Sequence, residues 1–314
     1  MNHFQFDLGG KRVWVAGHRG MVGSAVVRRL EREQIGELIT STSAEVDLRR
    51  QQQTEEFVAK SKPDVVVLAA AKVGGIVANR DAQGEFLYDN LMIAANVIEA
   101  ARRQSVERTV VLGSSCIYPR EAPQPMPESA LLTGPLEPTN EGYAVAKIAA
   151  LELGKMYRRQ YGTDVISLMP TNLYGPNDNY DLETSHVLPA LLRKVHEAKV
   201  SGAESVTIWG TGTPRREFLH VDDLADAVIF ATKHYVGETH VNVGVGEDIS
   251  ISELAVLMGE VIGWDGEFVY DRSKPDGTPR KLLDVSVLGS LGWSPQIGLK
   301  DGIAASYRAF VASG

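Results

Sequence analysis

The sequence has little cysteine, little excess basic charge and no long apolar run, and each shortage excludes a class of protein. A single cysteine among 314 residues excludes a disulfide within the chain and favours a reducing compartment. The formal net charge of −8 offers no basic face of the kind that nucleic-acid binding needs. No stretch reaches the roughly 18 uncharged apolar residues of a membrane-spanning helix, and residues 1–20 contain no apolar signal core. We therefore expect a cytoplasmic protein with no nucleic-acid or membrane partner.

The first half of the chain alternates short aliphatic runs with segments of helical length. Continuous Val, Ile and Leu in the short runs indicate strands that are buried on both faces, as in a parallel sheet. These strands are expected at Arg12–Ala16, Glu37–Thr40, Pro63–Ala70, Arg108–Leu112 and Asp164–Met169. The helices between them are expected at Met21–Glu33, Gln53–Lys60, Asn90–Gln104 and Tyr143–Tyr161. Right-handed crossovers then predict an α/β fold with a doubly wound, Rossmann-like parallel sheet.

The alternation becomes less regular after Tyr174. Residues 175–185 have the Gly, Pro, Asn and Asp content of a loop, and the proline-rich segment Pro119–Pro138 is expected to be a surface loop. Further elements are expected at His186–Ala198, Val206–Trp209, Val221–Lys233 and Thr239–Val243. We therefore expect a dinucleotide-binding domain over residues 1–178, to which residues 217–245 return. Residues 179–314 are expected to form a smaller mixed α/β domain that binds the substrate.

A glycine-rich turn with the spacing GxxGxxG follows the first expected strand directly. It consists of Gly17, His18, Arg19, Gly20, Met21, Val22 and Gly23. Glycine lets the chain turn tightly and approach a pyrophosphate, which the free N–H groups of the following helix then bind. A glycine triplet alone would also suit a flexible turn. The order of strand, glycines and helix favours a dinucleotide site.

The end of the second expected strand favours NADP over NAD. Sites for NAD place a carboxylate there, which would repel the 2′-phosphate of NADP. In this chain the strand runs into Ser41, Thr42 and Ser43, and no carboxylate occurs before Glu45. Arg19 can reach the 2′-phosphate from the glycine turn, the alternative being a solvated loop charge.

A serine, a tyrosine and a lysine occur in the order that proton transfer to a carbonyl oxygen requires. Ser114 follows the fourth strand, and Tyr143 and Lys147 lie one turn apart on the long helix. An ammonium beside the phenol is expected to lower the pKa of Tyr143 from about 10 toward neutrality. Ser114 could bind the same substrate oxygen. The Tyr-x-x-x-Lys spacing is common and recurs at Tyr270–Lys274, but that copy follows no strand-end serine and lies in a turn-rich region, so it is discarded. The alternative for Tyr143 is an exposed residue of an amphipathic helix.

With the segment Arg216–Asp223, these motifs resemble the extended short-chain dehydrogenase/reductase family, whose members commonly act on nucleotide sugars. Four further segments extend the resemblance over nearly the whole chain: Gly17–Ala25, Gly113–Pro119, Asn172–Tyr180 and Lys274–Asp284. They are similar to those of family members that epimerise GDP-4-keto-6-deoxymannose at C3 and C5 and reduce it at C4 with NADPH. The resemblance thus implies NADP as the cofactor and a GDP-linked keto-deoxysugar as the substrate.

The resemblance also implies roles for two residues that epimerisation needs. Cys116 would remove a proton next to the ketone and His186 would return one on the opposite face, while Tyr143 protonates O4. Without the resemblance, Cys116 would more often be an inert core residue and His186 a surface residue. A free thiol, with a pKa near 8.5, also needs a positive charge or a partner to act as a base at neutral pH.

Contacts with both ligands follow from the same resemblance. Besides the glycine turn, the cofactor would contact Ser43, Asp47, Leu112, Gly113, Ser114, Ser115, Lys147, Pro170, Asn172, Leu173 and His186. The nucleotide sugar would contact Lys194, Trp209, Arg216 and Asp276. Arginine can grip a diphosphate through two N–H groups, lysine offers a point charge, and tryptophan a flat apolar wall. The structural alternatives are a core tryptophan, a solvated arginine and a turn aspartate.

Two other functions fit parts of the pattern. An NAD-retaining nucleotide-sugar 4-epimerase or 4,6-dehydratase would share the fold, but a dehydratase typically carries Asp-Glu where this chain has Ser115-Cys116. A dinucleotide-sensing regulator would not need Ser114, Tyr143 and Lys147 together. Family members are often homodimers through paired helices, so a homodimer is expected.

Overall fold

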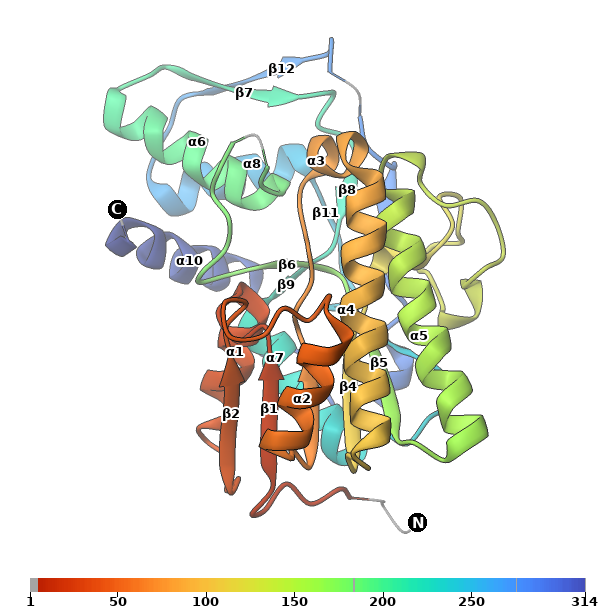
Figure 1. Ribbon diagram of the computed structural model, residues 1–314. Helices are drawn as coiled ribbons and strands as arrows, with labels where there is room; N and C mark the ends of the chain where they lie inside the picture. The colour runs from red at the N-terminus through yellow and green to blue at the C-terminus, as the bar shows by residue number, and fades with distance from the viewer. Residues whose placement is uncertain (1–4, 183, 275, 314) are drawn as a thin grey trace.

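A six-stranded parallel sheet forms the centre of the computed structural model, which describes residues 5–182, 184–274 and 276–313 (Figure 1). Its strand order is β10–β5–β4–β3–β1–β2. The strands are β1 (Arg12–Ala16), β2 (Glu37–Ser41), β3 (Val65–Leu68), β4 (Arg108–Leu112), β5 (Val165–Pro170) and β10 (Val241–Val243). From β1 the chain moves outward to β2 and then returns to β3 on the other side, so the order reverses beside β1. The predicted doubly wound α/β fold is confirmed.

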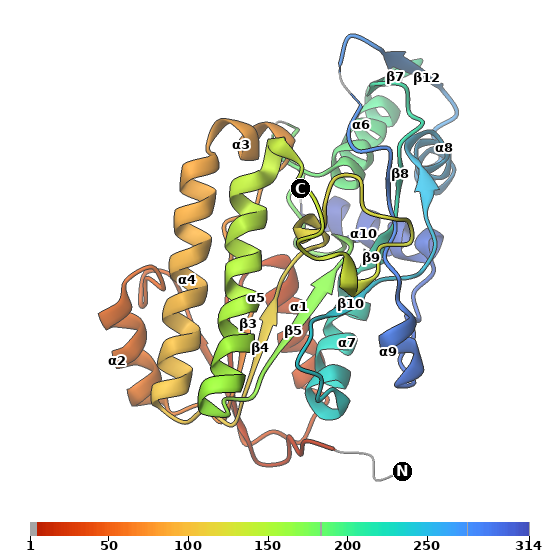
Figure 2. The ribbon, with the colours of Figure 1, turned by 90° about the vertical axis from the view of Figure 1, so that its right-hand side faces the viewer.

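Helices cover both faces of this sheet because successive strand side chains point to opposite faces (Figure 2). Val13 and Val15 pack on the side of α1 (Met21–Leu30) and α7 (Val221–His234). Trp14 and Ala16 pack on the other side, which is covered by α2 (Gln51–Ser61), α4 (Gln83–Arg103) and α5 (Glu141–Tyr161). The continuous aliphatic runs in the sequence therefore supply both cores at once.

A second part of the structure lies beyond the carboxyl ends of the strands (Figure 1). It contains α6 (Val187–Ser201), α8 (Ile251–Ile262) and α10 (Leu299–Ser313) around a core of their apolar side chains. Two of its small sheets are β12–β7 (Glu267–Asp271 with Ser205–Trp209) and β6–β9 (Asn172–Tyr174 with Phe218–His220). The third is β11–β8–β13, which consists of Ile249–Ser250, Arg215–Arg216 and Arg280–Lys281.

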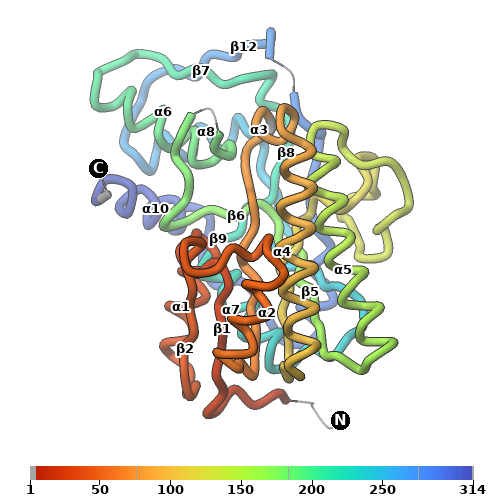
Figure 3. Tube along the Cα trace, in the orientation of Figure 1, coloured from red at the N-terminus to blue at the C-terminus, as the bar shows by residue number. Residues whose placement is uncertain are grey.

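The chain passes between the two parts more than once (Figure 3). It leaves the central sheet after β5, returns with α7 and β10, and leaves again for β11 and α8. We keep as a proposal the division into a dinucleotide-binding domain over residues 1–178, joined by 217–245, and a substrate domain over 179–314. No helix among the described residues is long and apolar enough to cross a bilayer.

Two local predictions were wrong, and the first of them is the start of helix α4. Helix α4 begins at Gln83 rather than Asn90, and the short helix α3 (Ile76–Asp81) precedes it. The added turns are stabilised by a tertiary contact, since the Asn90 amide accepts from Lys72 N at 2.9 Å and donates to Lys72 O at 3.0 Å.

The proline-rich segment Pro119–Pro138 is not simply a surface loop. Its side chains Ala122, Met126 and Ala130 are buried. They close a small core over Ile117 and Leu151. Proline-rich chain has no helical or strand periodicity, so its burial could not be predicted from the pattern.

Candidate active site

The predicted site residues lie at one edge of the central sheet. The turns after β1, β2, β4 and β5 all leave its carboxyl edge, because the strands are parallel. Strand β1 lies between β2 and β3, so the direction in which the chain adds strands to the sheet reverses at β1. Open α/β sheets bind ligands in the crevice that such a reversal leaves at the carboxyl edge.

The glycine turn is packed more closely than any side chain would allow. Gly17 has a φ of +89°, and a Cβ atom there would lie 2.6 Å from the backbone nitrogen of Ala70. A Cβ atom on Gly23 would lie 2.1 Å from the carbonyl oxygen of Gly17. Gly20 precedes α1 without a side-chain cap, so the first N–H groups of the helix have no side-chain acceptor there. This cradle fits the pyrophosphate of a dinucleotide.

Gly23→Ala is expected to lower the free energy of unfolding by about 1–3 kcal/mol, because the added methyl group displaces the Gly17 carbonyl. We also expect weaker NADPH binding, since the cradle moves with it. Gly20→Ala is the matched control, because its Cβ atom would meet only the Gly17 carbonyl oxygen, at 3.6 Å. Urea unfolding and fluorescence titration with NADPH measure both effects. Equal stability of the two variants would contradict the close packing at Gly23.

The end of β2 brings a carboxylate close to Arg19. The Glu45 carboxylate accepts from Thr42 N at 2.7 Å and from Thr42 Oγ1 at 2.8 Å. These bonds, and more weakly the charge of Arg19, lower the pKa of Glu45. Arg19 and Ser43 are both exposed beside it. The Glu45 carboxylate is therefore hydrogen-bonded to Thr42, while the Arg19 side chain is exposed and can bind an anionic ligand.

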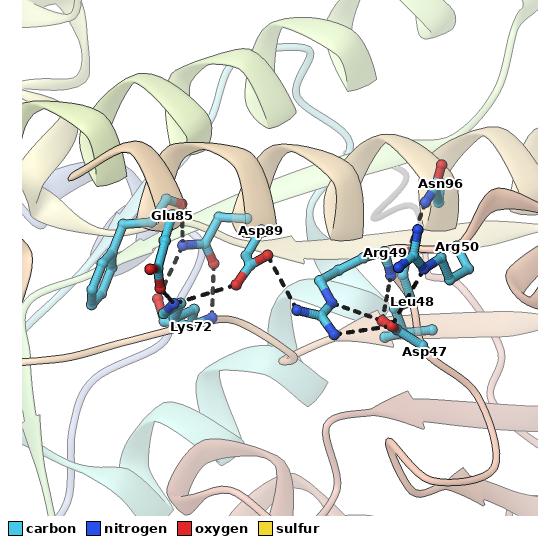
Figure 4. Close-up of polar contacts among 10 residues, drawn as sticks. Asp47, Leu48, Arg49, Arg50, Lys72, Glu85, Asp89 and Asn96 are labelled. Carbon is cyan, nitrogen blue, oxygen red and sulfur yellow. Dashed lines mark hydrogen bonds and ion pairs between the residues drawn. The ribbon is translucent and has the colours of Figure 1, made fainter. Parts of the chain in front are cut away.

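Asp47 belongs to a chain of ion pairs that ties the turn after β2 to helix α4 (Figure 4). Its carboxylate accepts from Arg49 Nε at 2.9 Å, and this bond lowers the pKa of Asp47. Arg49 also reaches Asp89 on α4 at 3.4 Å, and Asp89 lies 3.4 Å from Lys72. Lys72 in turn pairs with Glu85. The role of Asp47 in cofactor binding remains a prediction; in the structure it orients this turn.

The structure brings Ser114, Tyr143 and Lys147 together. The Lys147 ammonium lies 5.6 Å from the centre of the Tyr143 ring and donates to the Leu112 carbonyl at 2.8 Å. The Ser114 side chain is close enough to the Tyr143 hydroxyl to lower the pKa of the phenol. These contacts join the end of β4 to the first turns of α5.

The predicted acidity of Tyr143 is wrong for this structure. Burial raises the pKa of Tyr143 far above that of a free phenol, and Cys116 raises it further, against the Ser114 hydrogen bond. Lys147 does not offset this, because its ammonium is directed at the Leu112 carbonyl. Burial also lowers the pKa of Lys147 to about 8. The phenol is therefore in its protonated form at neutral pH, the form that donates a proton.

The side chains next to the Cys116 thiol are polar rather than apolar. Its Sγ atom accepts from Asn140 Nδ2 at 3.2 Å and lies 4.0 Å from the Lys281 ammonium. His186 is the residue that precedes α6, and part of its side chain is open to solvent. Burial of the ring, and then the charge of Lys281, lower the pKa of His186. Lys281 thus lies beside Cys116 and lowers the pKa of His186, the two groups to which the resemblance assigns epimerisation.

The four predicted substrate residues also converge. Lys194 Nζ lies 5.3 Å from the Trp209 ring centre, and Trp209 is 54% exposed, so it is not a core residue. The Asp276 carboxylate accepts from Thr211 N at 2.9 Å and so ties its own loop to the turn after Trp209. Burial lowers the pKa of Arg216, whereas Cys116 and Asp276 raise it. Together these four residues form one wall of the site, which carries the aromatic ring of Trp209 and the cationic side chains of Lys194 and Arg216.

The remaining predicted cofactor residues lie at the ends of β4 and β5. A Cβ atom on Gly113 would meet Met169 Sδ at 2.1 Å, so a larger residue there would displace the Met169 side chain. Ser115 is buried just after it. Pro170 ends β5, and Asn172 and Leu173 belong to β6. Asn172 Nδ2 donates to the Glu217 carbonyl at 2.9 Å and so fixes β6 against β9.

Two polar neighbours of Cys116 escaped prediction. Asn140 carries no motif of its own, and Lys281 lies 165 residues from the thiol in sequence. Lys281 falls in the segment Lys274–Asp284, which carried part of the resemblance, but its contact depends on the fold. No local sequence signal could have placed either beside the sulfur.

Comparison with known proteins agrees with this geometry. The model of the family described as NAD dependent epimerase/dehydratase matches residues 13–244. GDP-L-fucose synthase 1 from Arabidopsis thaliana is 57% identical over 296 residues, which cover 94% of this chain and 92% of that protein. GDP-L-fucose synthase from Sinorhizobium fredii is 55% identical over 306 residues, with 98% and 97% covered.

A solved structure extends the likeness to three dimensions. The crystal structure of a GDP-L-fucose synthetase from Naegleria fowleri bound to NADP matches with a TM-score of 0.90 at 27% identity. The match covers 100% of this chain and 98% of that chain. With a family model that spans most of its length and relatives that align over nearly all of theirs, the chain belongs to the NAD dependent epimerase/dehydratase family.

Proposed function

We propose that the protein converts GDP-4-keto-6-deoxy-D-mannose to GDP-L-fucose by epimerisation at C3 and C5 and NADPH-dependent reduction at C4. The observation that carries this proposal is the convergence of Ser114, Cys116 and Tyr143 at the sheet edge that also carries the glycine cradle. It occurs in a chain that is 57% identical to a protein named GDP-L-fucose synthase 1. The same function follows from the residues and from the relatives.

Reduction uses the side chains at the end of β4 and the start of α5. The glycine cradle and Arg19 would hold NADPH, which would supply the hydride for C4. Ser114 donates a hydrogen bond to the C4 oxygen, and the Tyr143 hydroxyl gives that oxygen its proton. An alkoxide is far more basic than a phenolate, so the raised pKa of Tyr143 does not prevent the transfer. Lys147 keeps a positive charge next to the phenolate that forms.

Epimerisation precedes reduction because it needs the ketone. The C4 carbonyl acidifies the hydrogens on C3 and C5, so a thiolate at Cys116 can remove one and become a thiol. His186 then returns a proton to the opposite face of the same carbon. The lowered pKa of His186 means that its ring is mostly neutral at pH 7, so the proton comes from the minor imidazolium form, which the neutral ring regenerates by taking a proton from solvent.

The wall formed by Lys194, Trp209, Arg216 and Asp276 suits the nucleotide half of the substrate. The exposed Trp209 ring, with Lys194 and Lys274 each within 5.5 Å of its centre, offers a stacking surface for a base. Arg216 can bind the diphosphate through two N–H groups. With its nucleotide bound to this wall, a GDP-sugar would place its sugar at Tyr143.

An NAD-retaining 4-epimerase or 4,6-dehydratase of the same fold is not favoured. Such an enzyme has no use for a thiol with polar partners at position 116. Incubation with GDP-4-keto-6-deoxymannose and NADPH tests the proposal, with the product identified by NMR. One NADPH consumed per GDP-L-fucose is the expected result. No GDP-L-fucose and no NADPH consumption, with a protein that purifies with bound NAD, would instead support the alternative.

The pH dependence of reduction is expected to follow Lys147. Burial lowers the pKa of Lys147 to about 8, so the ammonium predominates below that pH and is lost above it. We expect kcat to be constant near pH 7 and to fall with increasing slope above about pH 8. Lys147→Arg keeps its charge over this range and should remove the fall. A wild-type profile that stays flat to pH 9.5 would contradict the requirement for the ammonium.

We further propose that the protein is a cytoplasmic homodimer. Helices α4 and α5 lie side by side on one face of the molecule (Figures 1 and 2). They carry exposed apolar side chains at Tyr88, Val145, Met156 and Tyr161, which a second copy of the same pair could cover. Sedimentation velocity of the protein and of Met156→Glu measures the association.

A further inference from the structure

We propose that Asn140 and Lys281 are positioning residues that hold Cys116 as a thiolate, directed at the substrate. This inference rests on the proposed function, in which Cys116 removes the protons on C3 and C5. A cysteine reacts as a base or a nucleophile only in its thiolate form. The structure supplies two donors to the sulfur from parts of the chain that are far apart in sequence.

The first donor is an asparagine whose side chain is not used to cap its helix. Asn140 precedes α5 at the N-cap position, where an Asn side chain usually accepts from a backbone N–H of the first turn. It makes no such bond; its Nδ2 atom instead donates to Cys116 Sγ at 3.2 Å. Its Oδ1 atom is buried and has no partner among the described residues. The Nδ2 group can donate a proton but cannot accept one, so it favours a thiolate.

The second donor is a cation that pairs with no carboxylate among the described residues. Lys281 Nζ lies 4.0 Å from Cys116 Sγ and forms no ion pair with the part of the chain that the structure describes. Its neighbours differ: Arg280 and Arg215 both pair with Asp248. The charge of Lys281 is therefore available to the sulfur.

The small sheet β11–β8–β13 explains how this cation reaches the site. Strands β13 and β8 are parallel, with Lys281 opposite Arg216. Arg216 also interacts electrostatically with Cys116. The pairing of two short strands thus delivers two cations to the thiol, of which Lys281 is within contact distance. Cys116 and Lys281 line one recess, and Cys116 itself is partly exposed.

The single cysteine of the chain makes the test direct, because any alkylation by iodoacetamide reports on Cys116. At pH 7, without substrate, we expect Lys281→Met and Asn140→Leu each to be alkylated about tenfold more slowly than the wild type. Lys281→Arg restores a cation and should recover most of the rate. Lys300→Met, which removes an exposed lysine paired with Glu260, is the matched control and should change nothing.

A second readout follows solvent deuterium entering C3 and C5 of the keto sugar. We expect it to slow in parallel with alkylation in the Lys281 and Asn140 variants, while the affinity for NADPH stays the same. If Asn140→Leu does not fold, the comparison of Lys281→Met with Lys281→Arg carries the test alone.

Two results separate the possible failures. If Lys281→Met raises KM for the GDP-sugar but leaves alkylation of the free enzyme unchanged, Lys281 binds the diphosphate and this inference is overturned. If Lys281→Met slows alkylation but Cys116→Ser still exchanges deuterium at the wild-type rate, Cys116 is not the base. The second result overturns its role in the proposed function.

Discussion

Tyr143→Phe is expected to lower kcat for reduction by about 10²- to 10⁴-fold, because it removes the proton donor and little else. The phenyl ring keeps its edge contact with Phe86, whose ring centre lies 6.5 Å away. Lys147 keeps its bond to the Leu112 carbonyl. NADPH oxidation at 340 nm measures the rate, and fluorescence titration measures cofactor affinity, which we expect to be unchanged.

The chain contains its own control for this substitution. Tyr270 and Lys274 repeat the Tyr-x-x-x-Lys spacing, but Tyr270 lies in β12 of the second part. Tyr270→Phe should therefore leave reduction close to the wild-type rate. If Tyr143→Phe also lost NADPH binding, or if Tyr270→Phe lost activity to the same degree, Tyr143 would not be the specific donor.

Cys116→Ser is expected to stop solvent deuterium from entering C3 and C5, with a fall in exchange rate of about 10²- to 10⁴-fold. A serine hydroxyl is a far weaker acid than a thiol, so it supplies no anionic base at neutral pH. Proton NMR of the keto sugar in D₂O follows the exchange. Undiminished exchange would remove Cys116 from the mechanism.

The same variant separates the two reactions of the site. Reduction of a GDP-linked 4-keto sugar that needs no epimerisation should continue in Cys116→Ser, because Ser114, Tyr143 and Lys147 are intact. Loss of both reactions together would indicate that the substitution disturbs the pocket. The contact between Ser114 Oγ and the backbone nitrogen of residue 116, 3.3 Å long, does not depend on the thiol and should hold the turn in place.

Predictions succeeded where the physical cause is local. The glycine turn was readable because the approach of Gly23 to the Gly17 carbonyl involves residues six apart in sequence. Tyr143 and Lys147 were readable because one helical turn puts them on one face. The relation of Ser114 to Tyr143 followed from the carboxyl edge that parallel strands share.

Predictions failed where burial or distant contacts decide. The acidity of Tyr143 was misjudged because the desolvation of a phenol depends on everything packed around it, not on the lysine one turn away. The start of α4 was misplaced because the Lys72 backbone, 18 residues from Asn90, stabilises it. The burial of Met126 depends on a bridge to Leu283.

By itself, the sequence determined the parallel sheet, the glycine turn after β1 and the placement of Tyr143 and Lys147 on one helix face, because strand composition and helical spacing act over short stretches of chain. Only the tertiary structure decided the ionic environment of those groups. Lys281 meets Cys116 through the pairing of β13 with β8, and Lys147 is turned to the Leu112 carbonyl by the packing of α5 on β5 and α4. Electrostatic interactions depend on distance in space and on the exclusion of water, and the fold sets both.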